Sequence, residues 1–226
     1  MIGRVLWWLF WRLVRLGFWL GLIVLVLVLV MRWAGPGPTY LMLSERARLG
    51  AIEREWVPLE DIPAYVADAA VAAEDVHFCR HGGFDWAALR AAWADGASRG
   101  GSTISQQVAK NVFLWPERSW LRKGVEAGLT GLIERLWGKR RIMEMYLNVA
   151  EFGEGVFGVE AGAQAAFGRG AAELTRAQAA RLMSVLPAPR DRSPVNLGDI
   201  QARRLPVILD GSVAVGRDAR GACYRP

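Results

Sequence analysis

Apolar residues dominate the first 34 positions, and beyond them apolar and polar positions alternate with the spacing of helices. The uncharged run Leu16–Met31 has 16 residues and lies between Arg15 and Arg32. It falls slightly short of the roughly 20 residues that cross a bilayer, but arginine side chains reaching to the interface and the apolar flank Leu6–Phe10 lengthen it. We therefore expect a membrane anchor over residues 1–34.

The charges around this run predict its orientation. Arg4, Arg12 and Arg15 precede it, so the N-terminus should stay in the cytoplasm and the rest of the chain should be exported. Cleavage after Ala34 would put Arg32 at a position where a signal peptide needs a small residue. The sequence therefore favours an uncleaved anchor over a cleaved signal peptide.

Downstream, the pattern predicts a mainly α-helical domain with almost no alternating strand pattern. Glycine and proline at positions 35–38 break the anchor helix, and residues 35–60 are expected to be a linker and membrane-proximal segment. Its segment 53–58 could be a strand or an extended pass. We expect the main domain over residues 61–198, and one more helix followed by a tail over residues 199–226.

The first helix of the main domain carries an unusual carboxylate. Entering from Pro63 with Asp61 as its cap, it places Asp68 and Asp75 on the side where water is expected. Glu74 lies instead at the edge of the apolar stripe, which comprises Val66, Ala69, Ala70, Ala73 and His77. A carboxylate carried toward an apolar face costs free energy unless it is paired or used. The plain alternative is a half-exposed glutamate with a packed stem.

A second carboxylate repeats this pattern. In a helix predicted over residues 122–137, Glu126 falls on the apolar stripe. An i,i+4 ion pair with Arg122 would explain this position without any catalytic role. We favour a functional role because both anomalous acids fall within longer motifs.

The helix start near position 103 offers another kind of site. Thr103 and Gln106 fit a capping box, so a plain helix start is one interpretation. The exposed amides and hydroxyls of such a start also favour an anion, and Gln107 and Lys110 share one face there. The pattern therefore suits a phosphate as well.

Composition narrows the choice of partners. The chain carries 28 basic and 22 acidic residues, a net charge of +6, but the first 32 positions hold four of the basic residues and no acid. The rest carries a mixed surface with a net charge of +2, which argues against a nucleic-acid partner. Cys79 and Cys223 show no metal or redox spacing, and a disulfide between them is the less favoured alternative. With His77 and His81, Cys79 fits no common zinc spacing, so we expect structural roles for all three.

Four motifs, in order and spacing, resemble those of the monofunctional peptidoglycan glycosyltransferases of glycosyltransferase family 51. The resemblance covers roughly residues 60–194. The motifs are Glu74-Asp75-x-x-Phe78-x-x-His81-x-Gly83-x-Asp85, then Ser102-Thr103-x-Ser105-Gln106-Gln107-x-x-Lys110-Asn111, then Arg122-Lys123-x-x-Glu126, and last Lys139-x-x-Ile142-Met143-Glu144-x-Tyr146-Leu147-Asn148. Met143 stands where the family has leucine.

The resemblance implies a lysozyme-like helical domain and a small membrane-proximal lobe, with the active site between them. Glu74 and Glu126 would be the catalytic carboxylates, with Glu74 as the base and Glu126 orienting nearby cations or holding a divalent cation. The substrate-binding residues would be Ser102, Gln107, Lys110, Asn111, Arg118, Arg122 and Lys123. The structural framework would be Asp75, Phe78, His81, Gly83, Asp85, Tyr146 and Asn148.

The implied reaction joins lipid II to a growing lipid-linked glycan through a β-1,4 linkage and releases undecaprenyl pyrophosphate, without transpeptidase activity. A basic cluster, Lys110, Arg118, Arg122 and Lys123, would screen the pyrophosphate and keep Glu74 ionised by lowering its pKa. The implied partners are lipid II, the glycan, the membrane and other cell-wall synthesis proteins. The domain would lie on the periplasmic side of a bacterial inner membrane, with Mg²⁺ or Mn²⁺ as the one cofactor to consider.

Two other classes of protein stay open at this point. A lytic glycosidase of the same fold would also direct a glutamate at sugar, but it would have no need for the basic cluster. A membrane-anchored scaffold without enzymatic activity would leave both inward carboxylates unexplained.

Overall fold

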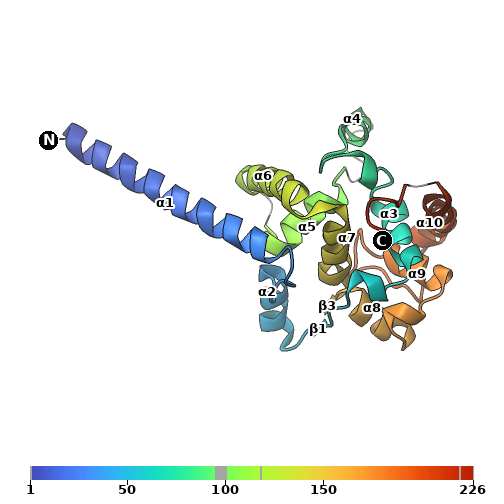
Figure 1. Ribbon diagram of the computed structural model, residues 1–226. Helices are drawn as coiled ribbons and strands as arrows, with labels where there is room; N and C mark the ends of the chain where they lie inside the picture. Colours follow the sequence, from blue (N-terminus) through green and yellow to red (C-terminus); the bar gives the residue numbers. More distant parts are fainter. Residues whose placement is uncertain (1, 95–100, 118, 219, 226) are drawn as a thin grey trace. The chain divides into compact units, whose positions relative to one another are not determined.

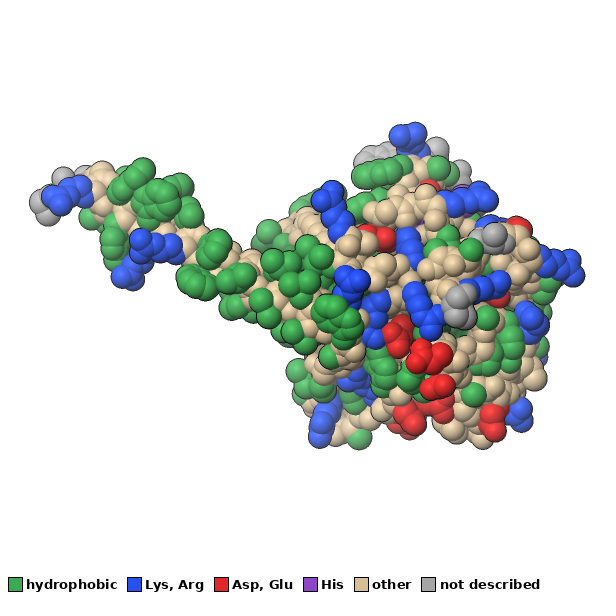
Figure 2. Space-filling model, in the orientation of Figure 1, with side chains coloured by type: hydrophobic (Ala, Val, Ile, Leu, Met, Phe, Trp, Pro, Cys, Tyr) green, Lys and Arg blue, Asp and Glu red, His purple; other side chains and the backbone are tan. Residues whose placement is uncertain are grey.

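The computed structural model describes residues 2–94, 101–117, 119–218 and 220–225, and the chain divides into two compact units, residues 1–35 and residues 36–226. The first unit is dominated by helix α1 (Ile2–Val30). Among the described residues, α1 is the one helix long and apolar enough to cross a membrane. Its apolar side chains are exposed along most of its length (Figure 2). Its 29 residues span roughly 40 Å, more than the ~30 Å of a hydrocarbon core.

The second unit is mainly helical, as predicted (Figure 1). Its α-helices are α2 (Tyr40–Leu49), α3 (Ala64–Glu74), α4 (Trp86–Ala94), α5 (Ile104–Phe113), α6 (Trp120–Leu136), α7 (Gly138–Val149), α8 (Val159–Phe167), α9 (Arg176–Met183) and α10 (Asp199–Arg217). Short 3-10 turns form η1 (Leu59–Asp61), η2 (Phe78–Arg80) and η3 (Ala171–Glu173). The likeness to lysozyme and the separate small lobe stay predictions.

A small sheet holds the segment expected to be a linker. Strand β1 (Glu53–Arg54) runs parallel to β3 (Val156–Phe157), and β2 (Glu151–Gly153) pairs antiparallel with β3. The strand alternative for the segment 53–58 is therefore right for its first two residues. Asn148 fixes the extended remainder, because its side chain accepts from the Val57 amide at 2.8 Å and donates to the Val57 carbonyl at 2.8 Å.

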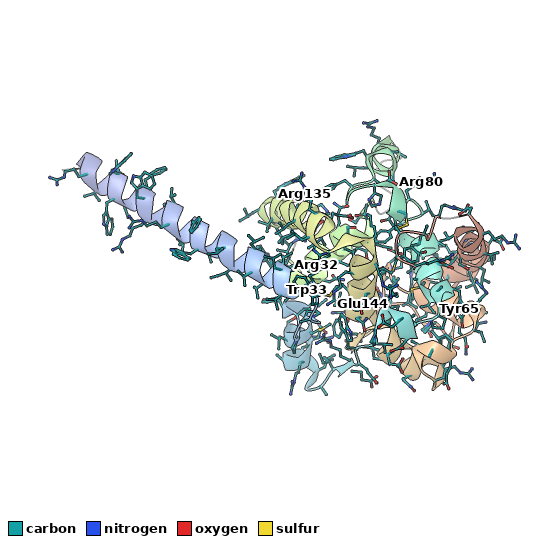
Figure 3. All side chains as sticks on the ribbon, in the orientation of Figure 1. Arg32, Trp33, Tyr65, Arg80, Arg135 and Glu144 are labelled. Atoms are coloured by element: carbon teal, nitrogen blue, oxygen red, sulfur yellow. A yellow bond between two sulfur atoms is a disulfide. The ribbon has the colours of Figure 1, made fainter. Side chains whose placement is uncertain are left out.

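Two groups of helices build the core of this unit. Helix α3 packs against α9 and α10, and α5 packs against α6 and α7. Ile142, Tyr146 and Val149 of α7 are buried in this core. The Tyr65 hydroxyl (labelled in Figure 3) donates to the Leu174 carbonyl and ties α3 to the segment before α9. These contacts make α3 a central helix and not a surface one.

That position overturns one sequence prediction. Asp68 and Asp75 were expected to face water, but both are buried. Helix α10 covers the side of α3 on which Asp68 lies, and Asp75 bonds His81 and the Ile104 amide at the start of α5. The predicted cap is wrong as well. Asp61 lies in η1, and Pro63 occupies the cap position of α3 without a side-chain hydrogen bond. The capping box of Thr103 with Gln106 is confirmed.

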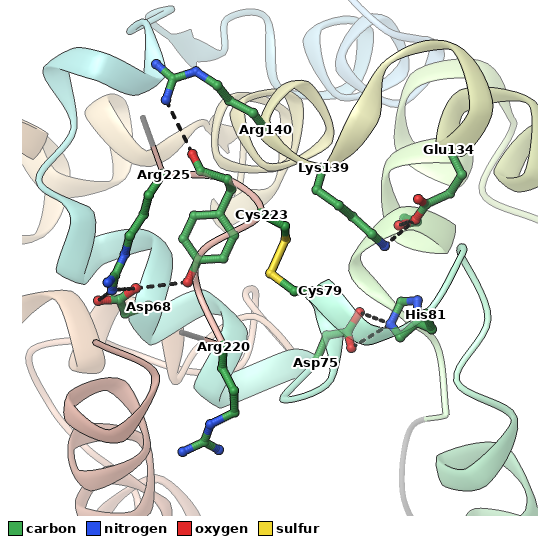
Figure 4. Close-up of a disulfide and its surroundings, with 12 residues drawn as sticks. Asp68, Asp75, Cys79, His81, Glu134, Lys139, Arg140, Arg220, Cys223 and Arg225 are labelled. Carbon is green, nitrogen blue, oxygen red and sulfur yellow. Dashed lines mark hydrogen bonds and ion pairs between the residues drawn. A yellow bond between two sulfur atoms is a disulfide. The ribbon is translucent and has the colours of Figure 1, made fainter. Parts of the chain in front are cut away.

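The C-terminal segment is more ordered than its sequence pattern indicates. Helix α10 runs through Pro206 to Arg217, so it takes up most of the segment 199–226 in which one helix and a tail were expected. After it, Cys223 forms a disulfide with Cys79 in η2, across 144 residues of sequence (Figure 4). The alternative that the sequence disfavoured is therefore the correct one.

Candidate active site

A cavity of about 420 Å³ lies between α5 and the N-terminal half of α6. Six predicted site residues line it: Ser102, Gln107, Lys110, Arg122, Lys123 and Glu126. Both helices are capped there, α5 by Thr103 and α6 by Ser119, whose hydroxyl accepts from the Arg122 amide at 3.1 Å. The lining carries three cationic side chains and one carboxylate, so it suits a phosphate-bearing ligand.

Glu74 lies at the last residue of α3, beside this cavity. It is half-buried, and the Gln107 side-chain amide donates to its carboxylate at 3.0 Å, which connects it to the cavity lining. Burial raises the pKa of Glu74 above its ordinary value, against the lowering effects of the Gln107 hydrogen bond and of Arg204 and Arg192. The basic cluster was expected to lower this pKa, and that expectation is wrong. The Glu74 carboxylate meets a neutral amide from the cavity side.

Glu126 occupies a different environment. It is buried in α6 with 2 % of its surface exposed, and the Arg122 guanidinium donates to it at 2.8 Å. Lys123 donates to its other carboxylate oxygen. The ion pair that the sequence offered as the plain explanation is therefore present. Arg122, Lys123 and Glu126 together place two cations and one anion on the same wall of the cavity.

Two arginines near Glu74 were missed by sequence reasoning. Arg204 of α10 donates from its guanidinium to the Ala73 carbonyl at 3.2 Å, one residue before Glu74. Arg192 also lowers the pKa of Glu74 through its charge. Residues 199–226 carry no motif that points to the site. Arg204 reaches it through the register in which α10 packs along α3, and a single sequence does not reveal that register.

The predicted framework residues join the first motif to the second. Asp75 accepts from His81 at 2.9 Å and from the Ile104 amide at the start of α5 at 3.0 Å. The Thr103 hydroxyl donates to the Gly83 carbonyl at 2.7 Å. Gly83 has a φ of +99°, and a Cβ there would lie 2.8 Å from the Thr130 side chain of α6. These contacts set the distance between Glu74 and the cavity.

Further residues of the predicted framework are buried or paired with other side chains, and their structural role stays a prediction. Phe78 is fully buried, with the Lys139 ammonium 4.4 Å from its ring centroid. His77 contacts the Asp85 carboxylate at 2.8 Å. The Tyr146 hydroxyl is buried without a hydrogen-bond partner among the described residues, and burial raises its pKa well above the ordinary value.

The remaining predictions from the sequence concern Asn111, Arg118, the helix after Asp85 and a metal site. Asn111 is half-buried on α5 but is not among the residues that line the cavity. Arg118 lies outside the described residues. The alanine-rich pattern after Asp85 predicts a helix over residues 86–97; α4 covers Trp86–Ala94, and residues 95–97 lie outside the described residues. Within the described part of the chain, no group of three histidine, cysteine or acidic side chains is placed to hold a metal ion.

Comparison with known proteins identifies the family. A family model described as "Transglycosylase" matches residues 43–212. The chain belongs to the transglycosylase family. It is 52 % identical over 206 residues to a biosynthetic peptidoglycan transglycosylase of Jannaschia sp. (strain CCS1), covering 90 % of this chain and 86 % of that protein.

Two further relatives carry the same name. The Caulobacter vibrioides protein is 46 % identical over 202 residues, covering 88 % of each chain. The Pseudomonas aeruginosa protein is 44 % identical over 220 residues, covering 93 % of this chain and 95 % of that one. All four motifs of this transglycosylase lie within the matched residues, as does most of α10 with Arg204.

Proposed function

We propose that this chain is a peptidoglycan glycosyltransferase that polymerises lipid II into linear glycan. The observation that carries the proposal is the pairing of Glu74 with a cationic cavity through Gln107, whose amide bonds the carboxylate while its helix lines the cavity. The reaction has two needs, a base for the acceptor hydroxyl and positive charge for the departing pyrophosphate. Glu74 meets the need for a base, and the cationic cavity beside it meets the need for positive charge.

In this mechanism Glu74 takes the proton from the attacking sugar hydroxyl. A base must be ionised, and the Gln107 amide, Arg204 and Arg192 all favour its ionised form against burial. The acceptor oxygen then bonds to the anomeric carbon of the lipid-linked glycan, and the pyrophosphate leaves with the electrons of the broken bond. The proton ends on the Glu74 carboxylate.

The cavity would receive the pyrophosphate. Lys110, Arg122 and Lys123 supply positive charge, with Arg118 proposed as a further cation, and Ser102 and Gln107 supply hydrogen bonds. Asn111 is proposed to add another. Because Glu126 already bonds two of these cations, its role is to orient them before the substrate arrives.

A divalent cation fits this set of residues poorly. The cavity lining offers one carboxylate, Glu126, and both of its oxygens already accept from cations of α6. Mg²⁺ and Mn²⁺ prefer several free oxygen ligands. A cation carried by the pyrophosphate itself stays a proposal, and no step of the mechanism depends on it.

Helix α1 is proposed to anchor the enzyme in the bacterial inner membrane with residues 36–226 on the periplasmic side. The arginines that precede its uncharged run support this orientation. Anchoring would keep the site near its lipid-linked substrates, and other cell-wall synthesis proteins are proposed partners. A reporter fused after Pro226 should be active in the periplasm and inactive in the cytoplasm.

A lytic glycosidase is the second candidate, and the raised pKa of Glu74 is the observation that favours it. A glycosidic oxygen needs a protonated carboxyl beside it, whereas a pyrophosphate needs fixed positive charge and no acid. The cationic cavity next to Glu74 therefore favours transfer over hydrolysis.

The deciding experiment gives the detergent-solubilised full chain two substrates. With lipid II it should make long, uncrosslinked glycan that lysozyme can digest. With purified cell-wall sacculi it should release nothing. Soluble muropeptides from sacculi, without polymer from lipid II, would show that Glu74 is an acid and that the chain is a hydrolase.

A further inference from the structure

The C-terminal strap, residues 220–225, returns to α3, the helix that ends at Glu74. Its Tyr224 hydroxyl donates to the Asp68 carboxylate at 2.9 Å, and its Arg225 guanidinium donates to both Asp68 oxygens at 2.6 Å. Asp68 is a buried carboxylate with 2 % of its surface exposed. Among the described residues, the side chains that bond Asp68 are Tyr224 and Arg225 of the strap. A buried charge that loses its partners is strongly unfavourable, so the strap and α3 depend on each other.

The strap also has a covalent attachment on the other side of Glu74. Cys223 is bonded to Cys79, which lies five residues after Glu74, whereas Asp68 lies six residues before it. Figure 4 shows the disulfide between the Asp68 cluster and the pair formed by Asp75 and His81. The strap therefore holds the segment that carries Glu74 at both of its ends.

Helix α10 connects the strap to the surroundings of Glu74. It packs along α3 so closely that a Cβ on Gly211 would lie 3.0 Å from the Ala72 side chain. Near its N-terminal end Arg204 bonds the Ala73 carbonyl. Fixing the C-terminal end of α10 through the strap thus also fixes where Arg204 stands relative to Glu74.

We propose that the strap is a disulfide-locked positioning element of the active site. Asp68, Cys79, Cys223, Tyr224 and Arg225 are its positioning residues, and none of them needs to touch substrate. They hold α10 in the register that places Arg204 beside Glu74, so full polymerisation activity requires the oxidised disulfide. The proposal rests on the proposed function, in which Glu74 is the base.

The electrostatic consequence has a defined sign. The charged and titratable groups around Glu74 are Arg204 and Arg192, which lower its pKa, Asp75, which raises it, and the buried Tyr146. If α10 shifts and Arg204 retreats, the pKa of Glu74 rises further. A base is active only when it is ionised, so the acid limb of the rate profile moves to higher pH.

The redox step balances with a simple dithiol such as dithiothreitol. Its two thiols are oxidised to a disulfide, while the Cys79–Cys223 bond takes up two electrons and two protons and becomes two thiols. Both cysteines are only half-buried, so a reductant can reach them. In an oxidising compartment the bond would be the normal state.

The test measures lipid II polymerisation by the full chain in detergent, from pH 5 to pH 9, with and without the dithiol. Reduction should lower kcat roughly tenfold with little change in KM, and should move the acid limb to higher pH. The double variant Cys79→Ser/Cys223→Ser should match the reduced protein and should not respond to the dithiol. Tyr224→Phe keeps the disulfide and should show a smaller shift of the acid limb in the same direction.

Arg220→Gln is the matched control, because it removes an exposed ion pair between the first residue of the strap and Asp218 and leaves the contacts to α3 in place. It should behave as wild type. An unchanged rate and acid limb after complete reduction of folded protein would overturn the proposal. If the double variant does not fold, reduction of the folded wild type decides alone.

Hydrogen exchange separates this proposal from the proposed function. Reduction should speed exchange of the α3 amides whether or not the protein makes glycan. Faster exchange in a protein that makes no polymer would leave the mechanical role of the strap standing and refute the function. Glycan synthesis by the oxidised protein with unchanged exchange and rate on reduction would refute the strap alone.

Discussion

Glu74 and Glu126 stand on two sides of the same site, and their surroundings differ in kind. Glu74 ends a helix, is half-buried and accepts a hydrogen bond from the neutral Gln107 amide. Glu126 lies in the middle of a helix, is fully buried and bonds to Arg122 and Lys123. Both looked alike in the sequence, as acids on apolar stripes.

The difference separates two uses of a carboxylate. A carboxylate between two cations is fixed as an anion, and its proton affinity serves no purpose in the reaction. A half-buried carboxylate whose pKa is raised by burial binds a proton more readily than an exposed glutamate does. Glu74 is therefore suited to proton transfer, and Glu126 to holding cations in place. The predictions below test this division.

The largest effect should come from Glu74→Gln. Removing the base should slow polymerisation by about 10³-fold. The melting temperature should stay level or rise at neutral pH. In the folded protein the pKa of Glu74 is higher than in the unfolded chain. As the pH rises from the unfolded pKa to the folded one, the cost of ionising Glu74 in the folded protein lowers the free energy of unfolding. Glutamine avoids that loss.

Polymerisation assays and thermal melts across pH 4–8 would measure both effects. Glu173→Gln is the matched control, since it removes an exposed carboxylate elsewhere in the same unit. A Glu74→Gln protein that is folded and polymerises at the wild-type rate would end the assignment of Glu74 as base.

Glu126→Gln should lower the stability of the fold strongly and the rate of polymerisation less. It leaves the buried Arg122 guanidinium without its anion, which should destabilise the fold by about 3 kcal/mol. For a unit of this size that lowers the melting temperature by roughly 6–12 °C. The fall in rate should be smaller than for Glu74→Gln. A variant that keeps its melting temperature but loses all activity would make Glu126 a participant in chemistry and not an orienting residue.

The sequence predicted much of the cavity because its residues lie in contiguous motifs. Gln107 and Lys110 share a helical face, and Arg122 and Glu126 are one turn apart, so local periodicity brings each pair together. The capping box at Thr103 is equally local. Each of these features depends on residues within four positions of one another.

What the sequence did not predict depends on contacts between distant segments. Asp68 was assigned to solvent because a helical stripe shows one apolar face, while α10 covers the other face with Tyr224 and Arg225 nearby. The disulfide joins cysteines 144 residues apart. The pKa of Glu74 was predicted with the wrong sign, because burial outweighed the nearby charges.

The smallest predicted effect concerns Arg204 of α10, which lies near Glu74. Arg204→Gln keeps a hydrogen-bond donor for the Ala73 carbonyl but removes the positive charge that lowers the pKa of Glu74. The pKa should rise, so the acid limb of kcat/KM should move to higher pH, with only a few-fold loss of rate on the alkaline side of the profile. Arg203→Gln is the matched control, because Arg203 is the adjacent residue of α10 and is exposed. It removes the same charge and should leave the acid limb in place. Equal profiles for the two variants would mean that Arg204 acts only through the backbone of α3, and Glu74 would then owe its ionised form to Gln107 and Arg192.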